Sequence, residues 1–225
     1  MELRPNGQRA TTAIMFLYIN VAVAAISLIS SFFQWQLLDD FKNGIDFSMG
    51  RAEANDQRES IIAIIYTVVY IFSIIYFIRW FRRAYFNLHQ RSNQLKYTEG
   101  WAAGAWFIPI FSLFAPYNIF KDLFTVSKNI LENKNVSLPV DLPLSLINLY
   151  WLFWVGGNIV SNISLRFSRS EDFDNLMTAT ILDMTSNVLT IVAGFLLVVI
   201  IKKYNQIEPL LNDMTSEIDK IGQNE

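Results

Sequence analysis

The sequence contains no cysteine, a single histidine and few charged residues. Without cysteine the chain has no disulfide, no thiolate nucleophile and no cysteine-ligated zinc or redox site. His89, alone and without a thiolate, does not make a zinc site. Charged residues are 17% of the chain, against about 25% in soluble domains. The net charge of −2 argues against nucleic acid as a partner.

The few charges leave long gaps between them. Uncharged runs extend over residues 10–38, 60–78, 100–120, 142–165 and 184–201. A helix crosses the hydrocarbon core of a bilayer in about 20 residues. A soluble amphipathic helix carries charged residues on its wet face throughout its length. The runs therefore predict a multi-pass integral membrane protein.

We predict an all-α bundle with four transmembrane helices, at about residues 12–33, 61–78, 144–165 and 184–201. The run at 101–120 differs, because Pro109 and Pro116 interrupt it and proline breaks the interior of a helix. We therefore predict a re-entrant or interfacial segment there. The alternative is a fifth, kinked span.

The distribution of lysine and arginine favours the first arrangement. If 101–120 enters and leaves on the same side, thirteen basic residues face the cytoplasm and five face outside. If all five runs span, each side has nine. Cytoplasmic loops carry the excess of basic residues, so we predict four spans with both termini in the cytoplasm.

The spans form a single predicted transmembrane domain, residues 1–203, followed by a cytoplasmic amphipathic tail helix, residues 204–225. The sequence has no stop signal after Ile78, so the second helix is predicted to continue into the cytoplasm to about Leu95. A polar loop is predicted at 34–59. The tail has one apolar stripe at helical spacing, formed by Ile207, Leu210, Leu211, Met214, Ile218 and Ile221. Acidic residues flank this stripe, which favours docking against another helix over binding an anionic membrane.

Three short patterns follow one another in the middle of the chain. The first has Trp80, Arg83, Ala84 and Asn87, the second Trp101, Trp106, Phe107 and Pro109, and the third Leu113, Pro116 and Tyr117. Together they resemble a bacterial membrane protein family labelled domain of unknown function 4328. Ser112 stands where that family usually has Asn. The resemblance implies a multi-pass protein of a bacterial cytoplasmic membrane, and it implies no activity.

The candidate functional residues are Trp80, Arg83, Asn87, Trp101, Trp106, Pro109, Pro116, Tyr117 and Asp183. Arg83 with Asn87 can bind a phosphate or carboxylate. The alternative is a membrane anchor, with Trp80 in the interfacial belt and Arg79, Arg82 and Arg83 on anionic lipid headgroups. Asp183 is an ionisable group beside a span. Its alternative role is helix capping or solvation.

Polar residues also recur inside the spans, at Asn20, Ser27, Ser31, Tyr66, Tyr70, Ser73, Asn158, Ser161, Asn162, Ser164, Asn187 and Thr190. They predict either a polar pathway or hydrogen bonds that join helices, and we favour the second interpretation.

The sequence has no catalytic motif, and no cofactor or metal site is predicted. The favoured function is therefore a non-enzymatic membrane interaction or organising protein, whose partners are the bilayer and a protein or second copy bound through the tail helix. The alternatives are a small-molecule transporter or channel that works as an oligomer, and an enzyme that binds lipid headgroups.

Overall fold

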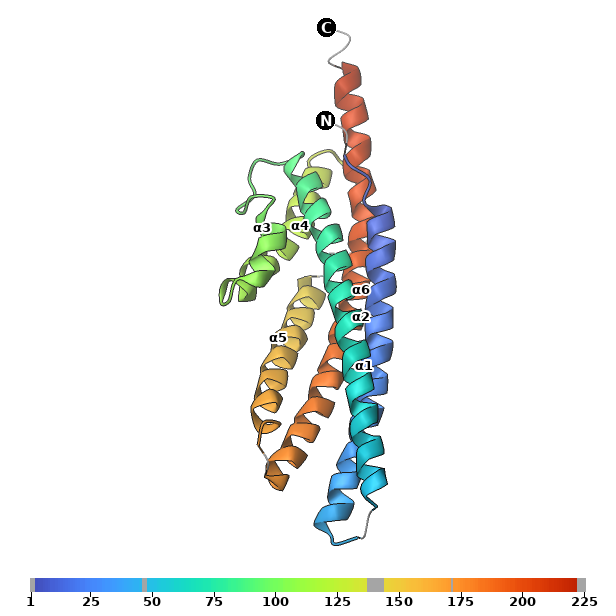
Figure 1. Ribbon diagram of the computed structural model, residues 1–225. Helices are drawn as coiled ribbons and strands as arrows, with labels where there is room; N and C mark the ends of the chain where they lie inside the picture. The colour runs from blue at the N-terminus through green and yellow to red at the C-terminus, as the bar shows by residue number, and fades with distance from the viewer. Residues whose placement is uncertain (1–2, 46–47, 137–143, 171, 222–225) are drawn as a thin grey trace. The chain divides into compact units, whose positions relative to one another are not determined.

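The computed structural model describes residues 3–45, 48–136, 144–170 and 172–221, with side chains described up to Leu211 (Figure 1). All regular structure in these residues is helical. The longer elements are α1 (Gly7–Lys42), α2 (Met49–His89), α4 (Ala115–Glu132), α5 (Leu144–Phe167) and α6 (Phe173–Ile221). Short turns of helix lie between α2 and α4: α3 (Trp101–Gly104), η1 (Ala105–Phe107) and η2 (Phe111–Leu113).

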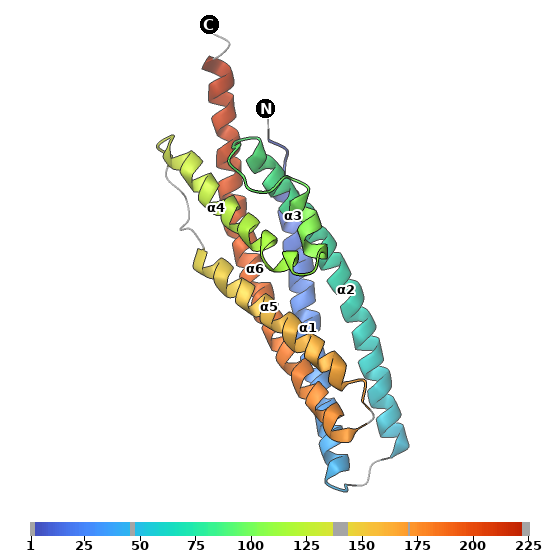
Figure 2. The same ribbon diagram turned by 90° about the vertical axis from the view of Figure 1, so that its left-hand side faces the viewer.

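Four of these helices, α1, α2, α5 and α6, are long and apolar enough to cross a membrane. The segment with the two prolines is a bent pair of helices, Trp101–Phe107 and Phe111–Glu132, that meet at 119° (Figure 2). The predicted all-α architecture, with four spanning helices and one Pro-interrupted segment, is confirmed.

The helices extend further than the apolar runs. The predicted loop at 34–59 is wrong, because α1 continues to Lys42 and α2 already begins at Met49. Polar residues end an apolar run but do not end a helix, and no proline or glycine lies between 34 and 42. The predicted extension of the second helix is confirmed as far as His89. The residues of the predicted tail helix that the structure describes continue α6 directly, with Pro209 inside it.

The bend of the Pro-interrupted segment is a strained turn at Ile110. Its backbone has φ 66° and ψ −50°, and the Phe111 N–H donates to the Pro109 carbonyl at 2.7 Å. This is a γ-turn with positive φ, which is rare for any residue and costly for a β-branched one. Apolar side chains around the turn are exposed: Phe107, Ile108, Ile110 and Phe114.

Contacts divide the chain into two compact units. Unit 2 comprises residues 16–73 and 149–195. Hydrogen bonds between its helices use the polar side chains predicted inside the spans: Ser73 Oγ donates to the Phe16 carbonyl (3.0 Å), Asn187 Nδ2 to Ser27 Oγ (3.2 Å) and Ser164 Oγ to the Ala179 carbonyl (3.0 Å). These bonds join α1 to α2, α1 to α6 and α5 to α6. These side chains therefore form the interhelical hydrogen bonds that were favoured from the sequence.

Unit 1 comprises residues 1–15, 74–148 and 196–225. Its core is aromatic and fully buried, with Trp80, Phe81 and Tyr85 from α2, Phe120 and Phe124 from α4, and Tyr204 from α6. The helix α4 is amphipathic. Its buried residues recur one helical turn apart, and its other face carries Lys121, Asp122, Lys128 and Glu132.

Glycine at 194 allows α1 and α6 to pack closely in unit 2. A Cβ placed there would lie 2.5 Å from Val21 Cγ2, a stiff branched side chain. We predict that Gly194→Ala lowers the free energy of unfolding by about 1–3 kcal/mol, because the helices must separate to admit the methyl group. Denaturation in mixed micelles, followed by circular dichroism, measures this loss.

Gly156 of α5 is the matched control. A Cβ at that position meets nothing within 4 Å, so Gly156→Ala is expected to leave stability unchanged or to raise it slightly. Equal destabilisation by both variants would show that Gly194 has no special packing role.

Candidate functional site

The Asn87 amide joins three segments of unit 1. Its Nδ2 donates to Glu208 Oε1 of α6 at 2.6 Å and to the Arg4 carbonyl at 2.9 Å, while its Oδ1 accepts from the Arg4 N–H at 3.1 Å. The amide thus pairs with the backbone of Arg4 as a neighbouring strand would. Asn87 is only 1% exposed, so none of this amide is presented to solvent.

Glu208 lies at the centre of this arrangement and is also buried. Asn6 Nδ2 donates to its two carboxylate oxygens at 3.2 and 3.0 Å, and also to the Trp80 carbonyl at 3.4 Å. We call Asn6, Asn87 and Glu208 the buried carboxylate cluster. It ties the segment before α1 to α2 and α6, and it satisfies both oxygens of a carboxylate that would otherwise be costly to bury.

Glu208 lies beyond Lys202 and Lys203, which end the apolar run of α6. Burial raises its pKa, while the hydrogen bonds from Asn87 and Asn6 and the positive charge of Arg83 act in the opposite direction. Burial prevails, so the fold favours the protonated acid more than water does.

Aromatic rings lie next to the buried carboxylate cluster. The Trp80 and Phe124 rings each contact the Tyr204 ring edge-on, with centroids 6.2 and 5.5 Å apart. The buried polar atoms in this region without a hydrogen-bond partner among the described residues include Trp80 Nε1 and Asn6 Oδ1. Trp80 is therefore a core residue of unit 1, and the predicted place in an interfacial belt is wrong for it.

Arg79, Arg82 and Arg83 have different surroundings in the structure. Arg82 Nε and Nη2 each lie 3.1 Å from Glu99 Oε1. Arg79 is exposed and Arg83 is half-buried. Arg83 does not share a surface with Asn87, because the Asn87 amide is enclosed by Arg4 and Glu208. The structure therefore does not assemble an Arg83–Asn87 phosphate site.

The other motif residues stabilise the bent segment. The Trp101 ring packs on Phe111 (4.7 Å) and the Trp106 ring on Phe77 (5.2 Å). Pro109 precedes the strained turn, and Pro116 is buried in the first turn of α4, where proline needs no N–H partner. The Tyr117 hydroxyl donates to Asn148 Oδ1 of α5 at 2.7 Å.

Asp183 belongs to unit 2, whereas all the motif residues belong to unit 1. It is exposed, and the Ser164 hydroxyl is its hydrogen-bonding neighbour. Among the residues that the structure describes, no group of three His, Asp or Glu side chains is placed to hold a metal ion.

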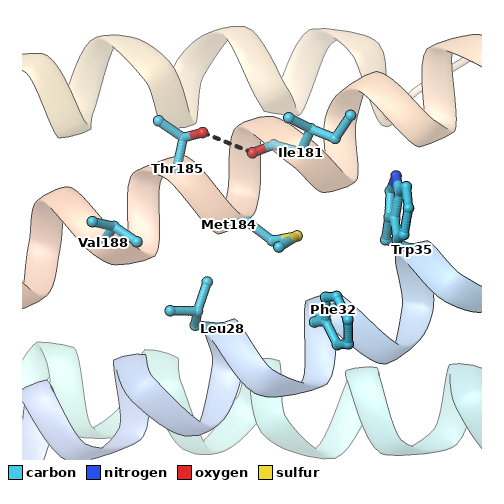
Figure 3. Close-up of a pocket in the computed structure, with 7 residues that line it drawn as sticks. All are labelled: Leu28, Phe32, Trp35, Ile181, Met184, Thr185 and Val188. Carbon is cyan, nitrogen blue, oxygen red and sulfur yellow. Dashed lines mark hydrogen bonds between the residues drawn. The ribbon is translucent and has the colours of Figure 1, made fainter.

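Unit 2 also contains a shallow apolar groove between α1 and α6, of about 500 Å³. It is lined by Leu28, Phe32, Trp35, Ile181, Met184, Thr185 and Val188 (Figure 3). The one hydroxyl in this set, on Thr185, donates to the carbonyl of Ile181 at 2.9 Å. The Trp35 indole nitrogen is the other polar side-chain atom of a lining that is otherwise apolar, and we expect lipid chains to fill the groove.

Four long apolar helices, joined by polar side chains and accompanied by a bent Pro-containing segment, define a multi-pass helical membrane protein. The family model for the domain of unknown function DUF4328 matches residues 43–206, more than half of the chain. The protein belongs to this family, as the motif predicted. No curated protein matches the chain. No solved structure matches it either.

Sequence reasoning missed Asn6, Glu208 and Tyr204. Asn6 and Glu208 are 202 residues apart, and both lie outside the matched range 43–206. In the sequence, Glu208 is one of the acidic residues that flank the tail stripe. Its position one helical turn after Tyr204 and next to Ile207, both buried, is the one local signal that it faces inward.

We predict that Glu208→Gln is tolerated, whereas Glu208→Ala lowers the free energy of unfolding by about 1–3 kcal/mol. The alanine removes the carboxylate acceptor shared by the buried Asn6 and Asn87 amides, which keep only the Trp80 and Arg4 carbonyls as acceptors. The glutamine keeps an acceptor and resembles the protonated acid. If the Asn6 side-chain amide rotates by about half a turn, its unpaired oxygen can accept a hydrogen bond from the side-chain amide of the introduced glutamine. Thermal unfolding in detergent measures both changes.

The same variant tests the raised pKa. The protonated acid stabilises the fold fully below the ordinary pKa of 4.5, and this stability is lost as pH rises through the raised value. Relative to Glu208→Gln, the wild-type protein should therefore lose stability as pH rises from about 4.5 through the raised pKa. Parallel pH profiles would contradict a raised pKa at Glu208.

Proposed function

We propose that this protein is a non-enzymatic membrane protein that binds a helix of another chain at the cytoplasmic face. The observation that carries the proposal is the length of α6. This helix continues to Ile221, and in both views its C-terminal end extends past the other elements of unit 1 (Figures 1 and 2).

The sequence gives this extension an apolar face. Ile207 and Leu211, at the start of the tail stripe, are buried within unit 1. The periodicity that includes them continues through Met214, Ile218 and Ile221. An apolar stripe along one side of a helix is typical of a surface that packs against another element, so it supports a role in binding a partner helix. The acidic residues beside the stripe favour a partner with basic residues.

Several buried polar groups of the described residues are used within the fold. In the ranges that the structure describes, Ser73 and Asn187 of unit 2 bond to neighbouring helices, and the buried carboxylate of unit 1 bonds to two amides. These groups stabilise the fold, which supports a structural role for them.

A photo-crosslinking amino acid in place of Ile218 tests this proposal in membranes of the producing cell. We expect a higher-mass adduct, with the partner identified by mass spectrometry as a second copy or another protein. Lys220 lies on the opposite side of the same helix and is the matched control position. Equal adducts at both positions, or none at Ile218, would contradict docking through the stripe.

We further propose that the protein resides in the cytoplasmic membrane of a bacterium, with both termini in the cytoplasm. The family resemblance and the excess of basic residues at 79–96 and 121–134 support this orientation. The amphipathic α4, whose outer face is charged, fits a position at the membrane surface better than one across the bilayer.

Single cysteines test the orientation, since the chain has none of its own. We predict that Asn133→Cys, just after α4, is protected from an impermeant thiol reagent in intact cells. Glu53→Cys should react, and Asn93→Cys should be protected. All three side chains replaced are exposed, so access to the reagent depends on the membrane. Labelling of Asn133→Cys would show that the bent segment is a fifth span.

A further inference from the structure

The side chain of one arginine bonds to the backbone of another arginine on a different helix of unit 1. Arg9 Nη1 of α1 donates to the backbone carbonyl of Arg79 of α2 at 3.1 Å. Arg9 lies just before the apolar run of α1 and Arg79 just after that of α2. Successive spanning helices are antiparallel, so both residues reach the same membrane surface at the level of the lipid headgroups.

Further positive charges surround this pair. Burial lowers the pKa of Arg9, and the charges of Arg83, Arg79 and Arg82 lower it further. Among the described residues Arg82 has a carboxylate partner in Glu99, whereas Arg9, Arg79 and Arg83 take part in no ion pair. Glu208, on which the positive charge of Arg83 acts, is buried and bonded to Asn6 and Asn87.

The chemistry of these side chains selects the ligand. A guanidinium group has five N–H donors, and one from Arg9 is used on the Arg79 carbonyl. The remaining donors of three arginines match the oxygens of a phosphate group, which accept bidentate hydrogen bonds. An anion held between them would also relieve the mutual repulsion of three like charges.

We propose that Arg9, Arg79 and Arg83 form a binding site for a phosphate-bearing anion at the membrane surface. The phosphate can belong to an anionic phospholipid or to a soluble phosphate compound. This site is separate from the tail stripe of α6, and its test does not depend on a partner protein.

Position, and not charge alone, distinguishes this site from a general excess of basic residues. Arg82 supplies the matched control, because it lies between Arg79 and Arg83 on the same helix but pairs with Glu99. A general electrostatic attraction would weaken equally on loss of any of these arginines. A defined site loses its ligand with Arg9, Arg79 or Arg83 and keeps it without Arg82.

The experiment uses the full chain in nanodiscs that contain equal amounts of phosphatidylcholine and phosphatidylglycerol. Native mass spectrometry counts the lipids that remain bound after release from the disc. We expect the wild-type protein and Arg82→Gln to retain phosphatidylglycerol over phosphatidylcholine by about tenfold, as one strong ionic contact provides. The triple variant with glutamine at 9, 79 and 83 should lose this preference.

A second arm identifies the source of the phosphate. Inorganic phosphate and glycerol phosphate are added to protein in discs of phosphatidylcholine alone, and thermal unfolding is measured. A rise in the unfolding temperature that the triple variant lacks assigns the site to soluble phosphates. Lipid selectivity without this rise assigns it to the headgroup.

Two results would overturn the proposal: a wild-type protein that responds in neither arm, or an Arg82→Gln variant that loses as much as the triple variant. If the triple variant does not fold, Arg83→Gln and Arg9→Lys replace it. The first removes one charge, and the second keeps the charge but loses the planar donor geometry. Unchanged lipid selectivity in both single variants would equally exclude the site.

Discussion

The structure of unit 1 depends on the burial of one carboxylate. Glu208 can lie in the aromatic core because Asn6 and Asn87 donate to its oxygens, and without them the group would be too costly to bury. The same bonds fix how α6 is placed along α2, because Tyr204, one turn earlier, then meets the Trp80 ring. The Trp and Asn of the family motif thus contact the same helix, one through its ring and the other through its amide.

In unit 2 the corresponding constraint is the absence of water in the bilayer. Polar side chains there need protein partners, and Ser73 and Asn187 find theirs on α1. Gly194 forms no side-chain hydrogen bond, but it lets α6 approach α1 closely. Hydrogen bonding and small residues therefore replace the hydrophobic effect, which cannot drive association between helices already surrounded by lipid tails.

The uncharged runs were enough to predict four spanning helices, because each run reports a local property of about 20 residues. The prolines at 109 and 116 likewise marked the bent segment. The C-terminal end of α1 and the start of α2 were mispredicted, since hydropathy shows where a helix leaves the apolar layer and not where it stops. The motif correctly indicated Trp80 and Asn87 as important, but their partners Tyr204 and Glu208 lie on the last helix. A contact across more than one hundred residues leaves no periodic trace in a single sequence.

The distance in sequence between the members of the buried carboxylate cluster also constrains biosynthesis. Asn6 is made 202 residues before Glu208, and the apolar runs lie between them. The first segment therefore cannot complete the cluster until α6 has been made. Chain synthesis thus delays the closure of unit 1 until the last helix is in place. A chain that lacks α6 would leave the Trp80 ring without its Tyr204 contact, and exposed hydrophobic surface of this kind makes partly folded chains prone to aggregate.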